Sequence, residues 1–162
     1  MFKVDIFGEL HTDEERARIV TELLARHKVE KYDFILSEEC GNVKAITKEK
    51  KLYAINRKMY SIGPQSYNLG LQLDLPVIGI DDWSAGVDWD NIPTKDAFAI
   101  REKRMLEVIT EYMKKGKCVV ILGDTHLRTI KTKELGDSSV VSKVLKNFNN
   151  VEIIRSPIGE IK

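Results

Sequence analysis

The sequence is poor in the residues that mark several specialised folds and sites: it has 2 cysteines, 4 prolines and 3 histidines. Cys40 and Cys118 lie far apart and match no metal-ligand spacing such as C-x-x-C. A disulfide scaffold and a zinc-finger site are therefore excluded, and a reducing, cytoplasmic setting is expected. No apolar run is long enough to span a bilayer, and the first residues lack the layout of a signal peptide, so a membrane role is not expected.

A strong charge of either sign is also missing. The net charge of +1 gives the whole chain no bias toward nucleic acid or a membrane surface. The hydrophobic content of 43% and charged content of 31% are ordinary for a globular protein. At 162 residues the chain is long enough for one domain with a substantial core, so we expect a single domain over 1–162.

One local exception is the segment 41–60, which is rich in lysine and arginine and contains Tyr53 and Tyr60. Such a stretch could bind phosphates or nucleic acid. A solvated helix face explains it more simply in a chain of nearly neutral charge. We therefore do not expect nucleic acid as a partner.

What the sequence does contain is a regular alternation of apolar strands and helical segments. Strands are expected at 2–7, 32–36, 76–80, 118–122 and 151–155, and helices after Thr12, at 43–60, at 95–115 and at 137–147. Thr12 and Glu15 form a capping-box pattern, and Thr94 and Gly116 are expected to bound the longest helix. Strands that are apolar throughout and alternate with helices predict a parallel α/β sheet with helices on both faces.

Acidic residues and histidines follow the predicted strands. The groups are Gly8, Glu9 and His11 after the first strand, Ser37, Glu38 and Glu39 after the second, Asp81 and Asp82 after the third, and Gly123, Asp124 and His126 after the fourth. Ligands of open parallel sheets bind beyond the carboxyl ends of the strands. We therefore expect these groups to converge on one site.

Two of the three histidines stand in the same four-residue frame, GELH at 8–11 and GDTH at 123–126. Histidine at such a position suits a general base or a metal ligand, and a loop-closing polar residue is the simpler alternative. The repetition favours function for His11 and His126. His27 falls near the end of its helix, where it would interact with the helix dipole, and no function is assigned to it.

The carboxylates at these strand ends differ in where they should point. Alternation along a strand sends Glu38 and Glu39 to opposite sides, and Glu38 continues the strand more directly, so Glu38 is the expected site residue. It could position water or bind a divalent ion, although solvated loop acids are the simpler explanation. Either Asp81 or Asp82 could join the site from the third strand.

Arg101 falls within an apolar stripe on the predicted helix 95–115, together with Phe98, Met105, Ile109 and Tyr112. A charge on an apolar face needs a partner, and the strand-end acids would supply one. Arg101 could bind a substrate oxygen, or it could form a structural ion pair that orients Glu38 or Asp82. The sequence leaves both possibilities open.

Several familiar site motifs are not found. The chain has no glycine-rich phosphate loop, no GxSxG, no HExxH and no GxGxxG. Cys40 could act as a nucleophile only with a base close by, which His11 would have to supply. Cys118 begins an apolar strand and is expected to be buried packing.

The ordered set GELHT, SEE, IDDW, IREKRM and GDTHLR resembles the superfamily of erythromycin esterases, TraB/Tiki-type proteins and haem-binding uptake lipoproteins. Proteins of that superfamily share a G-x-x-H or G-E-x-H element, one or two acids after the second strand, an R-[DE]-x-x-M segment and a later histidine. The matching residues are Gly8, Glu9, His11, Glu38, Glu39, Arg101, Glu102, Met105 and His126. The resemblance extends from residue 8 to residue 128.

The resemblance implies an α/β core and hydrolysis of an ester or amide by water, with a divalent metal in the Tiki-like members and haem in the uptake members. This chain differs from them in length, so the helical insertion that forms the substrate pocket would be reduced to 41–73. It also lacks a secretion signal, which argues against haem uptake. Asp124 is an additional acid before the second histidine.

We therefore expect a small cytoplasmic hydrolase acting on a small-molecule or peptide substrate. His11 would be the general base, Glu38 would orient or activate the water, Arg101 would stabilise the oxyanion, and His126 would be the second acid or base with its tautomer fixed by Asp124. Binding contacts are expected from Glu9, Glu39, Asp82 and Asp124. If a metal (Mn, Co or Zn) takes part, its ligands would be His11, Glu38 and His126.

Two other functions fit the same residues. The pocket could hold haem or another small ligand without turnover. Less favoured alternatives are a phosphoesterase and a nucleic-acid-associated protein that uses 41–60.

Overall fold

A computed structural model describes residues 1–40, 65–82, 91–159 and 161–162. Its centre is a five-stranded parallel sheet in the order β3-β2-β4-β1-β5. The strands are β1 (Val4–Glu9), β2 (Phe34–Ser37), β3 (Val77–Gly79), β4 (Cys118–Gly123) and β5 (Val151–Ile154). The predicted parallel α/β fold and all five predicted strands are confirmed.

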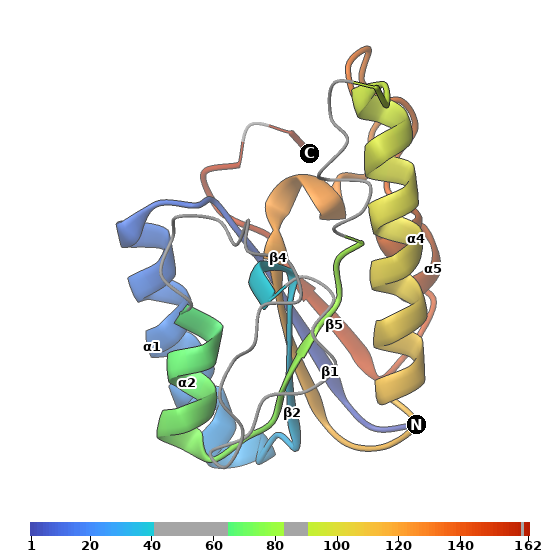
Figure 1. The fold of residues 1–162 in the computed structure, drawn as a ribbon. Helices are drawn as coiled ribbons and strands as arrows, with labels where there is room; N and C mark the ends of the chain where they lie inside the picture. Colours follow the sequence, from blue (N-terminus) through green and yellow to red (C-terminus); the bar gives the residue numbers. More distant parts are fainter. Residues whose placement is uncertain (41–64, 83–90, 160) are drawn as a thin grey trace.

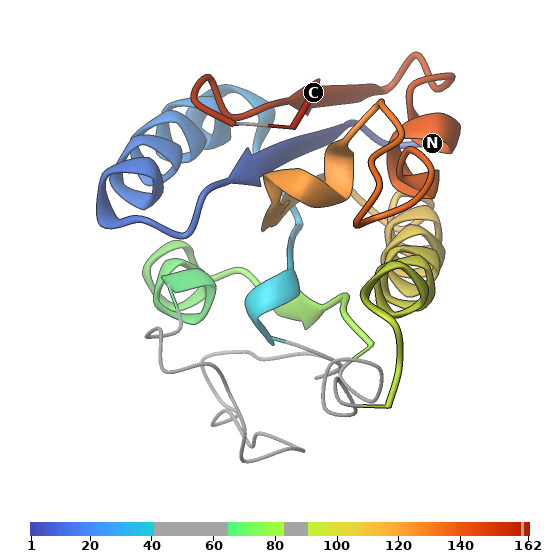
Figure 2. The same ribbon diagram turned by 90° about the horizontal axis from the view of Figure 1, so that it is seen from above.

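Helices cover both faces of the sheet (Figure 1). They are α1 (Asp13–Glu30), α2 (Gln65–Leu73), α4 (Thr94–Tyr112) and α5 (Val140–Leu145), with 3-10 turns η1 (Glu38–Cys40) and η2 (Asp124–Leu127). In the view onto the strand ends, α1 and α2 lie on one side of the sheet and α4 and α5 on the other (Figure 2). Among the described helices none is long and apolar enough to cross a membrane. The predicted helix 43–60 lies outside the described residues.

The two faces of the sheet form separate cores because successive side chains of a strand point to opposite faces. Toward α4 and α5 the strands contribute residues such as Ile6 and Val120, which pack with Met105 and Ile109. Toward α1 and α2 they contribute a second set, centred on Phe7, Ile35 and Val119 and packed with Ile19, Leu23 and Leu69. The continuously apolar strands follow from this burial on both faces.

Several helix ends differ from the expected ones: α4 ends at Tyr112 with its cap at Met113, before the expected Gly116, and α5 (Val140–Leu145) is shorter than the predicted helix 137–147. Thr12 caps α1 and its hydroxyl accepts a hydrogen bond from the Glu15 N–H at 3.3 Å. The Glu15 carboxylate does not complete the predicted capping box, because it accepts hydrogen bonds from Arg18 and Ser156. The cap of α4 is Pro93 and not the expected Thr94, since proline at this point already has the extended conformation that precedes a helix.

The order of the strands places the carboxyl ends of β1, β2 and β4 side by side. The chain runs from β1 to β3 with α1 and α2 on one face and returns to β4 and β5 with α4 and α5 on the other. In the register of the sheet, Glu9 of β1 pairs with Gly123 of β4, and Ser37 of β2 pairs with Ile121. The residues after these three strands are therefore close neighbours.

The two isoleucines of α4 provide a test of this packing. Ile109 is 0% exposed in the core and Ile100 is 43% exposed. We expect Ile109→Ala to lower the free energy of unfolding by about 2–5 kcal/mol because it leaves a cavity. The matched change Ile100→Ala should cost less than about 1 kcal/mol. Urea unfolding of both variants measures the difference, and equal losses would contradict the assigned orientation of α4.

Candidate active site

The carboxylate of Glu38 lies at the centre of the strand-end residues. It is buried in η1, directly after β2. Its Oε2 accepts a hydrogen bond from the Gly123 N–H at 2.9 Å, and its Oε1 lies 2.7 Å from His126 Nε2 and 3.1 Å from Arg101 Nη2. Burial alone would raise the pKa of Glu38, but the charge and hydrogen bond of His126, followed by the charge of Arg101, lower it to about 2. Glu38 is therefore a carboxylate at neutral pH.

His126 lies in η2 and is bonded through both ring nitrogens. Nε2 faces Glu38, and Nδ1 is 3.3 Å from the Glu102 carboxylate. The Phe98 ring stacks on the imidazole with 4.9 Å between ring centroids. Burial would lower the pKa of His126, but the charge of Glu38 and the hydrogen bonds with Glu102 and Glu38 raise it to about 9. The ring is thus an imidazolium that donates from both nitrogens at neutral pH.

Arg101 extends from α4 to the same carboxylate. Its Nε and Nη2 donate to the two oxygens of Asp81 at 2.9 and 2.8 Å, and Nη2 also donates to Glu38. The prediction that this arginine meets the strand-end acids is confirmed, as is the convergence of Glu38 and His126. Of the two aspartates considered, Asp81 forms this buried ion pair. The binding role expected for Asp82 stays a prediction.

Glu102 and Arg128 belong to this group and were not assigned a site role from the strand-end pattern. The Glu102 carboxylate accepts a hydrogen bond from Arg128 Nη1 at 2.6 Å while it contacts His126. The sequence carried a signal for Glu102, because it lies four residues after Phe98 and three before Met105 on the buried side of α4. A charged residue at that spacing needs a buried partner in the same way as Arg101.

His11 is in a different environment. Its side chain is 50% exposed, and its Nδ1 is 3.1 Å from Oε1 of Glu9, which is buried. This hydrogen bond raises the pKa of His11; burial opposes the rise, and the charges of Glu38 and Glu9 add to it. Because Glu9 is a carboxylate acceptor, Nδ1 carries the proton of the neutral ring and Nε2 carries the lone pair.

Nε2 of His11 and Oε2 of Glu38 both lie close to Gly123. An atom bonded to the Gly123 Cα in the position of a Cβ would lie 3.3 Å from Glu38 Oε2, 3.4 Å from His11 Nε2 and 3.6 Å from His126 Cδ2. The Gly123 backbone, with φ −59° and ψ 134°, is open to any residue. Close approach of side chains, and not conformation, is therefore the constraint at this glycine.

Glu39 contacts α2, whereas Glu38 contacts α4. Both residues lie in the turn η1, after β2 has ended, so this turn and not strand alternation separates them. Oε1 of Glu39 accepts a hydrogen bond from the Ser66 N–H of α2 at 3.2 Å. Burial raises its pKa to about 7, with a further contribution from the charge of Glu9. Glu39 therefore does not share the Glu38 position.

The expectation that Asp124 fixes the tautomer of His126 is wrong, and the binding role expected for Asp124 stays a prediction. Its two oxygens accept hydrogen bonds from Arg155 Nε and Nη2 at 2.9 Å each, and Oδ1 also accepts one from the Ser156 N–H. The two ring nitrogens of His126 face Glu102 and Glu38 instead. Asp124 lies so close to Gly8 that a Cβ there would overlap its Oδ1. In GDTH the acid Asp124 therefore binds the C-terminal segment at Arg155 and Ser156. In GELH the acid Glu9 instead contacts His11 of the same frame.

The expected metal ligands His11, Glu38 and His126 do not fit a metal ion in this arrangement. Both nitrogens of His126 face carboxylates and carry protons, so neither offers a lone pair. Over the described ranges, no group of three or more histidine, cysteine, aspartate or glutamate side chains is placed to hold a metal. Because both nitrogens of His126 face carboxylates, His11 is the one of these two histidines that could serve as an axial ligand of haem. Of the cysteines, Cys118 is buried in β4, and the side chain of Cys40 lies outside the described part.

Comparison of the chain with protein-family models, with curated proteins and with solved structures found no match.

The charge of His126 predicts a pH dependence of stability. Its folded pKa of about 9 exceeds the ordinary value of 6.5, so its contribution is complete below about pH 6.5 and is lost as the pH rises through 9. We expect the wild type to lose on the order of 3 kcal/mol from this group over that interval, and His126→Gln to be less stable at pH 6.5 but to lose less. Urea unfolding at pH 6.5, 7.5 and 9 measures both. Parallel curves would show that His126 is neutral in the folded protein.

Proposed function

We propose that the protein is a hydrolase that activates water above Gly123 and directs it at an ester or amide bond of a small molecule or peptide. The observation that carries the proposal is that His11 Nε2 and Glu38 Oε2 border the same space beside Gly123, 3.4 and 3.3 Å from the position that a Cβ on this residue would take. The proposed water lies farther from the Gly123 backbone than that position, between the two acceptors, and donates one hydrogen bond to each. This geometry leaves an oxygen lone pair available for attack.

His11 is the general base in this proposal. Glu9 accepts the Nδ1–H, which turns Nε2 toward the water and stabilises the imidazolium that forms on proton transfer. The ring is half-exposed and so within reach of a substrate, whereas His126 is buried. Once protonated, His11 can return the proton to the leaving group.

Glu38 orients the water and does not take its proton. With a pKa of about 2 it is a poor base at neutral pH, but its fixed Oε2 is a good hydrogen-bond acceptor. An isolated carboxylate beside a developing oxyanion would repel it. The positive charges of Arg101 and His126, 3.1 and 2.7 Å from Oε1, offset that repulsion and favour the anionic transition state.

The ordered motifs from GELHT to GDTHLR support the same chemistry through their resemblance to the erythromycin esterase and TraB/Tiki superfamily. The steps proposed here use only side chains of this chain.

Substitutions at His11 and Gly123 test the proposal. Using p-nitrophenyl acetate and p-nitroacetanilide as substrates, we expect His11→Ala to lower kcat/KM by about 100-fold or more, the scale of general base catalysis. Gly123→Ala should also lower kcat/KM, because its methyl group would lie 3.3 Å from Glu38 Oε2 and 3.4 Å from His11 Nε2 and would obstruct the space between them. Urea unfolding would verify that both variants are folded. Unchanged turnover of an accepted substrate by His11→Ala would show the mechanism to be wrong.

The pH dependence of the rate gives a second test. The base must be neutral, so kcat/KM should rise with pH through the pKa of His11, which Glu9 raises above the ordinary 6.5. Glu9→Gln removes the carboxylate that accepts from Nδ1 and should shift this rise to lower pH as well as reduce the plateau. A rise that stays at the same pH in Glu9→Gln would assign the titration to another group.

Ligand binding without turnover is the competing outcome. If neither ester nor anilide is hydrolysed, and haem addition gives a Soret band that His11→Ala removes, the site is a binding site. In that case the half-exposed His11 is the ligand, since His126 is bonded on both sides.

A further inference from the structure

A second group of charged residues surrounds Glu9 at the carboxyl edge of the sheet. Glu9 ends β1 and is buried, and its Oε1 lies 3.1 Å from Nδ1 of His11. Nη2 of Arg16 lies 3.9 Å from the same oxygen. The mechanism above gives roles to Glu9 and His11 and none to Arg16, although its guanidinium approaches the oxygen that orients the base.

The backbone of Arg16 is fixed by both helices on this face of the sheet. Arg16 lies near the start of α1, where its N–H donates to the Thr12 carbonyl at 3.0 Å. Its own carbonyl accepts a hydrogen bond from Gln65 Nε2 of α2 at 3.0 Å. Only 13% of the side chain is exposed. The guanidinium therefore extends toward Glu9 from a fixed point and is largely shielded from water.

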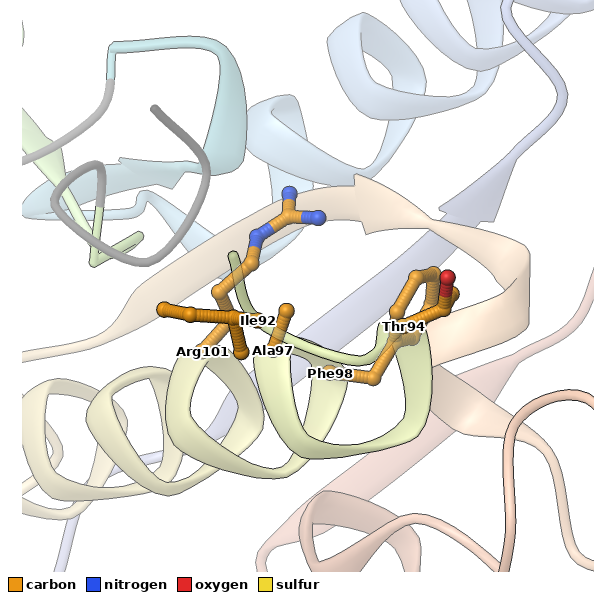
Figure 3. A pocket seen from close by; sticks show the side chains of 5 residues that line it. All are labelled: Ile92, Thr94, Ala97, Phe98 and Arg101. Carbon is orange, nitrogen blue, oxygen red and sulfur yellow. The ribbon is translucent and has the colours of Figure 1, made fainter. Parts of the chain in front are cut away.

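Arg16 differs from the other arginines at this edge in its hydrogen bonds. The others donate to buried carboxylates, and they are Arg101, Arg128 and Arg155. Figure 3 shows one of them, Arg101, with its guanidinium extended away from the Ala97 and Phe98 side chains. Within the described residues no atom accepts a hydrogen bond from the buried Nε of Arg16, and the Glu9 oxygen is beyond hydrogen-bonding distance of Nη2. Arg16 therefore acts on Glu9 through its charge.

This arrangement leaves the hydrogen bond of Glu9 to His11 and gives its charge a second partner. A carboxylate beside an imidazole favours the protonated ring, because the charged form gains an opposite charge nearby. The hydrogen bond with Glu9 raises the pKa of His11 and the charges of Glu38 and Glu9 add to the rise, whereas burial and the positive charge of Arg16 oppose it. Arg16 thus limits the effect of Glu9 on the proton of His11.

Glu39 is a further carboxylate on which Arg16 acts. Its Oε1 accepts a hydrogen bond from the Ser66 N–H at 3.2 Å. Burial raises the pKa of Glu39 to about 7, the charge of Glu9 adds to the rise, and the charge of Arg16 opposes it. Removal of Arg16 would leave protonated His11 to compensate these carboxylates, which favours the imidazolium.

We propose that Arg16 is a positioning residue of the hydrolase, which compensates part of the negative charge of Glu9 so that Glu9 orients His11 without keeping it protonated. The proposal rests on the hydrolase function inferred above, because that function makes His11 the base. It adds the residue that keeps this base available near neutral pH. Arg16 acts through Glu9 and contacts neither the water nor the substrate.

Titration of the His11 ring by nuclear magnetic resonance tests the proposal without any substrate. In Arg16→Gln we expect the midpoint of His11 to rise by about 0.5 to 1 in pH, because a nearby positive charge is lost. Arg16→Lys keeps the charge and should restore most of the wild-type midpoint. Arg16→Met keeps the aliphatic part of the side chain and should give the same rise as Arg16→Gln. An unchanged midpoint in the neutral variants would overturn the proposal.

The matched control is Arg18→Gln, which removes the same charge from the same helix. Arg18 is bonded to Glu15 and Glu22 and is 33% exposed. This variant should move the midpoint of His11 by less than about 0.2 in pH, because solvent and salt screen an exposed charge. A rise equal to that of Arg16→Gln would make the effect one of net charge and would contradict a specific role for Arg16.

A double-mutant cycle with Glu9→Gln tests whether Arg16 acts through Glu9. In the Glu9→Gln background, Arg16→Gln should raise the midpoint of His11 by less than about half of its effect in the wild type, because the carboxylate that Arg16 compensates is gone. Equal rises in both backgrounds would show that Arg16 acts on His11 directly and would overturn the positioning role.

The rate with p-nitrophenyl acetate gives the catalytic measurement. At pH 6.5 we expect kcat/KM of Arg16→Gln to fall by about 3- to 10-fold, the same change expressed as the fraction of neutral His11, with little change on the alkaline plateau. A lower plateau with an unchanged midpoint would indicate a structural role and overturn the proposal. If the midpoint of His11 moves as expected and no ester is hydrolysed, the hydrolase function fails and the effect of Arg16 on His11 stands.

Discussion

A buried carboxylate at the end of a parallel strand requires compensation of its charge, and the strand-end region of this protein is arranged around that requirement at Glu38. A backbone N–H from β4, a guanidinium from α4 and an imidazolium from η2 meet its two oxygens. The guanidinium of Arg101 and the imidazolium of His126 are themselves buried cations, and each needs an anionic partner in turn. Asp81 supplies it for Arg101, and Glu102 supplies it for His126.

The result is a row of alternating charges, Arg128, Glu102, His126, Glu38, Arg101 and Asp81, that connects η2, η1, α4 and the end of β3. Removal of any inner member would leave a buried charge without its partner, which costs far more than a surface ion pair. The row fixes the positions of Glu38 and the Gly123 backbone. The proposed water position beside Gly123 depends on this fixed placement.

The two histidines illustrate how environment separates chemical roles. His126 is enclosed by carboxylates and an aromatic ring, so it keeps its proton and serves as a fixed positive charge. Nδ1 of His11 contacts the Glu9 carboxylate and half of the side chain is exposed to solvent, so the ring can gain and lose a proton. The proposed hydrolysis would use both behaviours, a stationary charge and a mobile proton, and the burial of each ring decides which behaviour it has.

The sequence by itself determined the sheet, the convergence of acids and histidines at one edge and the need of Arg101 for an acidic partner. Each of these follows from local rules: apolar strands alternate with helices, strand side chains alternate in direction, and a charge in an apolar stripe must be paired.

Only the tertiary structure decided that Asp81 pairs with Arg101, that Glu102 holds His126, and that Asp124 turns away toward Arg155. GELH and GDTH read alike in sequence, but β1 places Glu9 beside its own histidine, whereas Arg155 and the Ser156 N–H draw Asp124 to the C-terminal segment. Partner choice among several nearby charges depends on distances between elements that are far apart in the chain, and those distances arise only when both faces of the sheet are packed.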